Sequence, residues 1–170
     1  MDSLVTAVAK YLIIVPVIVA LYFIWALKGD QRKKYIILLI VGGLISLIIA
    51  KLAGHIYVNP RPAFKDGASP LFHADGYNGF PSDHTLLASL LGFVIVRFSR
   101  RWGWFVLVIA ALIGWARVAG HVHHFVDILA SFVITAVVVF IIDELLIARI
   151  HQHPKKDQPA GHTQADKSEK

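Results

Sequence analysis

The sequence contains no cysteine among its 170 residues, which excludes disulfide bonds and thiol chemistry. No internal repeat is visible, so a solenoid or repeat array is also excluded. Polar residues are too few for a soluble globule of this size, because 56% of the residues are hydrophobic and the mean hydropathy is +0.63. This shortage of polar residues indicates an integral membrane protein.

Five apolar runs are candidates for transmembrane helices, each of which needs about 20 residues to cross a bilayer core. They cover residues 11–27, 35–50, 85–96, 102–115 and 125–147. The run 85–96 is short enough for a buried core helix, and its place among four longer runs favours spanning. No small-residue cleavage pattern follows Lys10, so the first run is expected to be a retained span. We predict an all-α membrane bundle of about five helices over residues 1–150.

Basic residues indicate which loops face the cytoplasm. They gather in residues 28–34, 97–101 and 149–156, and five spans would place these three segments on one side of the membrane. This predicts a multi-pass plasma-membrane protein with a cytoplasmic C-terminus, and with loops 51–84 and 116–124 facing outside. The net charge of +6 needs no nucleic-acid partner, since anionic lipid headgroups explain it. Residues 151–170 are polar, and a disordered tail is expected.

The longer outer loop contains two features suited to binding an anion. Arg61 stands between Pro60 and Pro62, which restrict the backbone around a guanidinium that can grip a phosphate or carboxylate in bidentate fashion. The sequence FPSDHT at residues 80–85 then opens a helix whose N-terminus offers unpaired N–H groups to an anion, with His84 in its first turn. Taken singly, Arg61 is equally compatible with a headgroup or loop contact, and FPSDHT fits an ordinary helix cap with an interfacial histidine better than an anion site.

The shorter outer loop, GWARVAGHVHHFVD at residues 114–127, supplies further charged and titratable groups. If the last helix begins near His123, then Asp127 shares a face with it and can orient its imidazole as a nucleophile or base. Arg117 ends the preceding span on the same side. One alternative is that these side chains reach the lipid headgroups at the interface. Another is a metal cluster of His121, His123 and His124. The metal cluster is disfavoured, because the adjacent His123 and His124 would point in different directions on a helix.

These stretches resemble the type 2 phosphatidic acid phosphatase superfamily of membrane lipid phosphatases. The family motifs are a lysine separated by six residues from Arg-Pro, then Pro-Ser-Gly-His, then Ser-Arg with five residues to His and three more to Asp. The corresponding residues here are Arg61-Pro62, Pro81-Ser82-Asp83-His84, and Arg117 with His123 and Asp127. The form FPSDHT most resembles the branch of undecaprenyl-diphosphatases of the bacitracin-resistance type.

Three positions depart from the family pattern. Gly54 occupies the lysine position, and Lys51, one helical turn earlier, is the nearest candidate to replace it. Asp83 stands in place of the glycine and adds a carboxylate beside the expected phosphate site. Ala116 stands in place of the serine and removes one hydrogen-bond donor.

The resemblance implies hydrolysis of a polyprenyl diphosphate lipid without a metal or other cofactor. His123 would attack the terminal phosphorus, Asp127 would fix its tautomer, and His84 would protonate the leaving oxygen and later activate water. Phosphate binding would fall to Arg61, Arg117, Ser82 and Lys51. We expect Arg61, His84, Arg117, His123 and Asp127 to share one pocket at the outer end of the bundle.

Three other functions are compatible with the same residues. The substrate is open between undecaprenyl diphosphate, phosphatidic acid and phosphatidylglycerol phosphate, because nothing in the sequence measures the lipid site. A binding or transport protein that captures an anion without turnover is a second possibility, and a histidine-based metal-binding protein is a third. The oligomeric state does not follow from the sequence.

Overall fold

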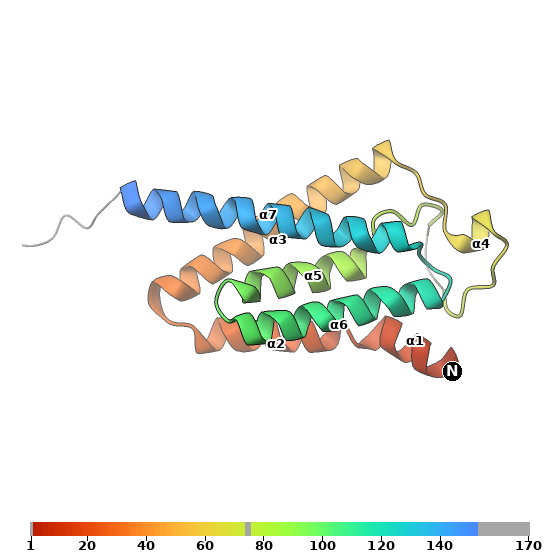
Figure 1. Cartoon of the computed structure of the whole chain (residues 1–170), viewed down its shortest axis with the longest axis horizontal. Coiled ribbons are helices and arrows are strands. Elements are labelled where there is room, and N and C mark those ends of the chain that lie inside the picture. Colours follow the sequence, from red (N-terminus) through yellow and green to blue (C-terminus); the bar gives the residue numbers. More distant parts are fainter. Residues whose placement is uncertain (1, 74–75, 153–170) are drawn as a thin grey trace, which may run out of the picture.

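Long apolar runs fold here into helices, the conformation in which a chain in lipid satisfies its own backbone hydrogen bonds. The computed structural model describes residues 2–73 and 76–152, and Figure 1 shows an all-helical bundle. The predicted fold class is therefore confirmed. The helices are α1 (Asp2–Tyr11), α2 (Ile14–Ala26), α3 (Gly29–Ile56), α4 (Pro62–Lys65), α5 (Asp83–Val96), α6 (Arg100–Ala119) and α7 (Phe125–Gln152).

Among the described residues, four helical segments are long and apolar enough to cross a membrane: Asp2–Ala26, Gly29–Ile56, Arg100–Ala119 and Phe125–Ala148. The first is already helical nine residues before the apolar run that we expected to span, and it is interrupted by a turn between α1 and α2. α5, with 14 residues, is the short fifth helix. α7 continues to Gln152, and residues 153–170, the rest of the predicted tail, lie outside the described residues.

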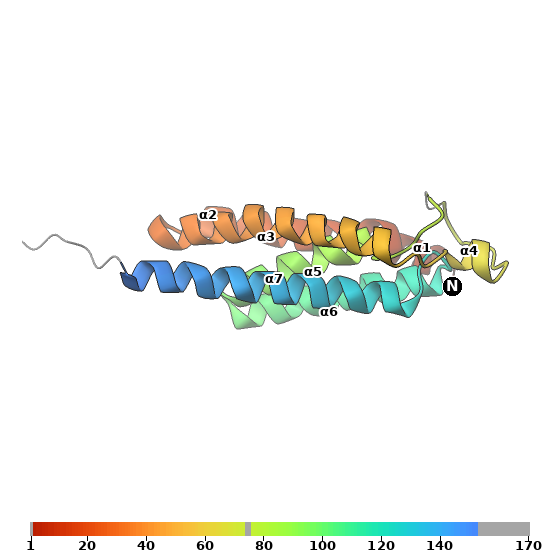
Figure 2. The same ribbon diagram turned by 90° about the horizontal axis from the view of Figure 1, so that it is seen from above.

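α5 is the central helix of the bundle, which explains how it can be short. It contacts α2, α3, α6 and α7, and most of its side chains are buried. Figure 2 shows α2 and α3 on one side of the molecule and α6 and α7 on the other. A helix enclosed by protein needs less apolar length than a helix that faces lipid. These contacts hold the N-terminus of α5, with the FPSDHT residues 80–85, between the ends of the neighbouring helices.

Small residues bring the helices that carry the site close together. A Cβ atom on Gly92 of α5 would lie 2.6 Å from the Leu107 side chain of α6, and one on Gly114 of α6 would lie 2.5 Å from Ile128 of α7. Neither position has room for a methyl group without a shift. Close approach at small residues is the usual way for membrane helices to gain packing contacts. The relative positions of α5, α6 and α7 are thus set within narrow limits.

The two ends of the bundle differ in their chemistry. At one end, Asp143 of α7 is fully buried and forms ion pairs with Lys34 of α3 and with Arg97, which follows α5. The Nζ atom of Lys34 lies 2.6 Å from the Asp143 carboxylate. Two of the basic segments predicted to share one side, residues 28–34 and 97–101, therefore meet at this end. The loop carrying α4, the turn after α6 and α1 gather at the opposite end (Figure 1).

Candidate active site

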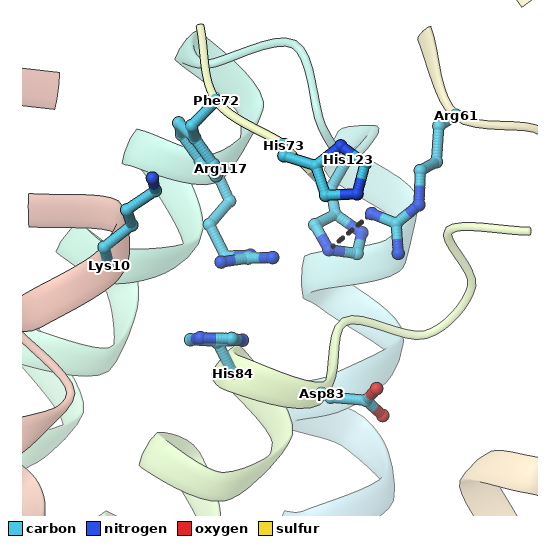
Figure 3. A pocket seen from close by; sticks show the side chains of 8 residues that line it. All are labelled: Lys10, Arg61, Phe72, His73, Asp83, His84, Arg117 and His123. Carbon is cyan, nitrogen blue, oxygen red and sulfur yellow. Dashed lines mark hydrogen bonds between the residues drawn. The ribbon is translucent and has the colours of Figure 1, made fainter. Parts of the chain in front are cut away.

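A polar pocket of about 280 Å³ opens at the end of the bundle that carries the long loop. Its walls come from α1, the loop around α4, the first turn of α5, the last turn of α6 and the turn before α7 (Figure 3). The lining residues are Lys10, Arg61, Phe72, His73, Asp83, His84, Arg117 and His123. Four of the five residues expected to share one pocket line it, and the fifth, Asp127, is buried behind His123.

His123 is held so that one ring nitrogen is engaged and the other is turned to the pocket. Its Nδ1 atom lies 2.8 Å from the Gly79 carbonyl oxygen and 3.3 Å from Oδ2 of Asp127. Both partners can only accept a hydrogen bond, so Nδ1 carries the proton and Nε2 carries the lone pair. Nη1 of Arg61 lies 3.3 Å from Nε2. The backbone of Gly79 thus shares with Asp127 the orienting role predicted for the carboxylate.

Asp127 is fully buried, and three further groups stabilise it as a carboxylate. Asn59 donates from Nδ2 to Oδ1 over 2.7 Å, and the His124 backbone N–H donates to Oδ2 over 2.8 Å. The third donor is Nδ1 of His123. A buried charge without such partners would be costly, whereas this carboxylate is satisfied on both oxygens. The partners lie up to 68 positions away in the sequence.

Two arginines reach the pocket from opposite sides. Arg61 donates from Nη1 to the Val122 carbonyl over 2.8 Å and from Nε to the Gly76 carbonyl over 3.0 Å. Arg117 donates from Nη1 to the Ala9 carbonyl of α1 over 3.3 Å, and its guanidinium lies 5.7 Å from the centroid of the Phe72 ring. Its Nε is buried and makes no hydrogen bond to any described residue. Arg117 lines the pocket, where a guanidinium can bind an anion.

The pocket favours the neutral form of His123. Burial is the main cause and lowers the pKa of this imidazole below its ordinary value, and the guanidinium groups of Arg117 and Arg61 lower it further. The hydrogen bond and negative charge of Asp127 oppose this shift without reversing it. At neutral pH the ring is therefore uncharged, which is the state required of a nucleophile.

Ser82 and Lys51, both predicted to bind phosphate, lie differently from the other candidates. Ser82 is buried, its Oγ accepts a hydrogen bond from Thr85 over 3.2 Å, and its carbonyl accepts one from Ser131 of α7. It joins α5 to α7 beneath the pocket. Lys51 lies outside the pocket, in an adjoining cavity of about 210 Å³, with Nζ 3.7 Å from the Asp83 carboxylate. The extra carboxylate at position 83 is thus accompanied by its own cation.

The remaining histidines of the turn between α6 and α7 do not converge on a common point. His124 Nε2 lies 3.0 Å from the Pro60 carbonyl oxygen, and His121 is exposed in a left-handed backbone conformation with φ of 58°. Within residues 2–73 and 76–152, no group of three His, Cys, Asp or Glu side chains is arranged to hold a metal ion.

Several residues of the site were not expected from the sequence. Asn59, Gly79 and Phe72 lie in a loop without periodicity, and Lys10 lies in a helix distant in sequence from every motif. Asn59 stands two positions before Arg61, which is the one signal that could have drawn attention to it. Lys10 carried no such signal, because only the packing of α1 against α6 brings it to the pocket.

The arrangement of these motifs agrees with comparisons to known proteins. The family model of the PAP2 superfamily matches residues 33–151. The chain belongs to the PAP2 superfamily. This match includes the Arg-Pro, Pro-Ser-Asp-His and Arg…His…Asp motifs and excludes α1 and α2.

Individual PAP2 proteins show which members the chain resembles. Undecaprenyl-diphosphatase BcrC of Bacillus subtilis is 28% identical over 142 residues, which are 83% of this chain and 72% of that protein. Bacitracin transport permease protein BcrC of Bacillus licheniformis is 30% identical over 108 residues, 63% of this chain and 53% of that protein. These relatives support the bacitracin-resistance branch.

Two solved structures share the PAP2 fold at 21% sequence identity. LpxE of Aquifex aeolicus aligns with a TM-score of 0.63 over 82% of this chain and 83% of its own. A transmembrane PAP2 type phosphatidylglycerolphosphate phosphatase from Bacillus subtilis aligns with a TM-score of 0.56 over 88% of this chain and 77% of its own. The chain is thus a multi-pass membrane protein of a phosphatase fold.

Proposed function

We propose that this protein hydrolyses undecaprenyl diphosphate to undecaprenyl phosphate and inorganic phosphate through a phosphohistidine, without a metal ion. The observation that carries the proposal is the state of His123. Its Nδ1 is tied to Gly79 and Asp127, and its Nε2 faces a pocket that contains two guanidinium groups and His84. A neutral imidazole so oriented is a nucleophile, and the surrounding cations suit a phosphoryl group.

In the first step Nε2 of His123 attacks the terminal phosphorus. The N–P bond forms, the bond from that phosphorus to the bridging oxygen breaks, and His84 donates its proton to the leaving oxygen. The phosphorylated ring keeps its proton on Nδ1 and carries positive charge, which the carboxylate of Asp127 stabilises. The lipid leaves as its monophosphate.

In the second step water replaces the histidine on the phosphorus. His84, now neutral, removes a proton from the water as its oxygen attacks, and the N–P bond breaks. Inorganic phosphate leaves and His123 returns to its neutral form. Arg61 and Arg117 stabilise the charge on the transferring group in both steps, and such electrostatic stabilisation is the largest contribution in phosphoryl transfer. Arg61 exchanges its contact with Nε2 for the phosphoryl oxygens.

A lipid substrate is supported by an apolar groove of about 510 Å³ beside the site. Leucines of α3 and α5 line it, and it ends at Lys51 and Asp83, which also border the adjoining polar cavity. A hydrocarbon chain next to the pocket would therefore remain in an apolar environment. We assign the polyprenyl diphosphate as substrate because the Bacillus subtilis relative is named an undecaprenyl-diphosphatase. The site would face outside and the basic end of the bundle the cytoplasm.

A second substrate class has specific support. One of the solved structures that shares this fold is titled a phosphatidylglycerolphosphate phosphatase, which favours a glycerophospholipid such as phosphatidylglycerol phosphate or phosphatidic acid. The same two-step chemistry applies to these substrates, since only the leaving group differs. Capture of an anion without turnover is the remaining alternative, and the Bacillus licheniformis relative bears a transport name.

The deciding experiment is phosphate release by the detergent-purified protein from undecaprenyl diphosphate, phosphatidylglycerol phosphate and phosphatidic acid, with and without EDTA. We expect release from the diphosphate to be fastest, to persist in EDTA and to be abolished in His123→Ala. His121→Asn is the matched control, because it alters an exposed histidine of the same turn and asparagine tolerates a positive φ. Absence of release from all three lipids in the wild type would overturn the proposal in favour of anion capture.

A further inference from the structure

Lys10 is a third cation of the pocket, and it comes from outside the three motifs. It ends α1 and lines the pocket, with its Nζ 5.4 Å from the centroid of the Phe72 ring. The preceding residue, Ala9, is fully buried and accepts the hydrogen bond from Arg117. The position of Lys10 is thereby tied to that of Arg117. No carboxylate among the described residues forms an ion pair with it.

The first motif does not supply this third cation. A Cβ atom on Gly54, which occupies the family lysine position, would lie 2.7 Å from the Phe80 backbone oxygen, so a larger residue does not fit without a shift of the loop. The Lys51 ammonium lies beside Asp83 in the adjoining cavity. Arg61, Arg117 and Lys10 are therefore the Lys and Arg side chains that line the pocket.

The place of Lys10 is defined by its relation to His123. In Figure 3, Arg117 lies between them, with His123 and Arg61 on one side and Lys10 on the other, and His84 lies below Arg117. In an in-line displacement the leaving group departs on the side opposite the attacking nitrogen. It therefore leaves His123 in the direction of His84 and Lys10. A leaving group that itself carries a phosphate would bring its charge toward the Lys10 ammonium.

We propose that Lys10 forms a subsite for the second phosphate of a diphosphate substrate, next to the site where the terminal phosphoryl is transferred. This inference rests on the proposed function for the identity of the lipid. The subsite itself needs only a diphosphate group. Lys10 would favour diphosphates over monophosphates, because the cation meets an anion only when the leaving group is phosphorylated.

Binding of two non-hydrolysable probes tests the subsite without requiring turnover. Calorimetry on the whole chain in detergent measures the affinities of methylenediphosphonate and methylphosphonate. The proteins compared are the wild type, Lys10→Gln, Lys10→Arg and Lys51→Gln. We expect the wild type to bind the diphosphonate more tightly than the monophosphonate. In Lys10→Gln the ratio of the two dissociation constants should fall about tenfold, which is the effect of losing one exposed charge-assisted hydrogen bond. Lys10→Arg should keep the preference. Lys51→Gln should weaken both probes, because the Asp83 charge then lacks its cation, and should reduce the preference for the diphosphonate by less than Lys10→Gln does.

Two results would overturn the subsite. The first is an unchanged preference for the diphosphonate in Lys10→Gln. The second is a preference that disappears in Lys51→Gln and not in Lys10→Gln. That result would place the second phosphate on the side of the α3–α5 groove. Parallel assays of phosphate release separate this inference from the proposed function. A Lys10-dependent preference in a protein that releases no phosphate contradicts only the function. Turnover with an unchanged preference in Lys10→Gln contradicts only the subsite.

Discussion

Asn59 offers the sharpest test of how His123, the proposed nucleophile, is oriented. Its Nδ2 donates over 2.7 Å to the carboxylate of Asp127, and the two side chains are 4% and 0% exposed, so water does not screen the contact. Asn59→Ala removes one hydrogen bond to a buried charge, worth about 1.5–3 kcal/mol of folding free energy. The carboxylate is then held by fewer donors. We expect kcat to fall about tenfold, because Asp127 no longer holds the imidazole in one orientation.

The pH profile distinguishes this role from a purely structural one. In the wild type, burial and two guanidinium groups lower the pKa of His123. Without Asn59, the carboxylate of Asp127 accepts one hydrogen bond fewer, so its negative charge interacts more strongly with His123. The protonated imidazole is then favoured, its pKa rises, and the acid limb of kcat/KM moves to higher pH. The assay is phosphate release between pH 4 and pH 9 at saturating and limiting lipid, combined with thermal unfolding.

Asn78→Ala is the matched control for Asn59→Ala. Asn78 accepts from the backbone N–H groups of Asn59 and Phe80 and donates to the Gly54 carbonyl, and none of these contacts reaches Asp127. The control should destabilise the loop and leave the acid limb in place. An acid limb that is unmoved in Asn59→Ala, with a lowered unfolding temperature, would refute the reasoning and reduce Asn59 to a structural residue.

Four further results are expected. The acid limb of the wild-type kcat/KM should lie below pH 6.5, the ordinary pKa of histidine, because burial lowers the pKa of His123. His84→Ala should lower kcat about 100- to 10,000-fold, as measured by initial rates, because it removes the proposed general acid. Gly54→Lys, which restores the family residue, should lower activity and the unfolding temperature, because its Cβ meets the Phe80 carbonyl at 2.7 Å and such overpacking costs about 1–3 kcal/mol. Asp143→Asn should destabilise the bundle by up to about 3 kcal/mol in thermal unfolding while KM stays constant, because Lys34 and Arg97 lose their buried partner at the far end from the site.

The sequence was sufficient for the membrane class, the helical fold and most of the pocket. Hydrophobic runs report directly on transmembrane helices, since lipid leaves the backbone few alternatives. The spacing of Arg117, His123 and Asp127 is local, so the contact between His123 and Asp127 forms as expected. The expected shared helix face was wrong, because α7 begins at Phe125 and His123 lies in the turn before it. The interruption between α1 and α2 and the start of the first helix at Asp2 were not visible in the apolar pattern.

Contacts between distant segments account for what the sequence left open. Ser82 and Lys51 have the right chemistry for phosphate binding, yet packing turns Ser82 toward α7 and pairing with Asp83 holds Lys51 in the adjoining cavity. Lys10 and Asn59 carry no local pattern. They join the site only because α1 packs on α6 and because the long loop folds back on the start of α7.

The sequence by itself determined that this protein is a helical membrane protein with its motif residues in or beside two loops, because hydropathy and motif spacing are properties of short segments. Tertiary structure alone decided which cations line the pocket and which nitrogen of His123 is held by Gly79 and Asp127. Those outcomes depend on distances between groups as far apart as Ala9 and Arg117, or Asn59 and Asp127, and such distances exist only once the helices have packed.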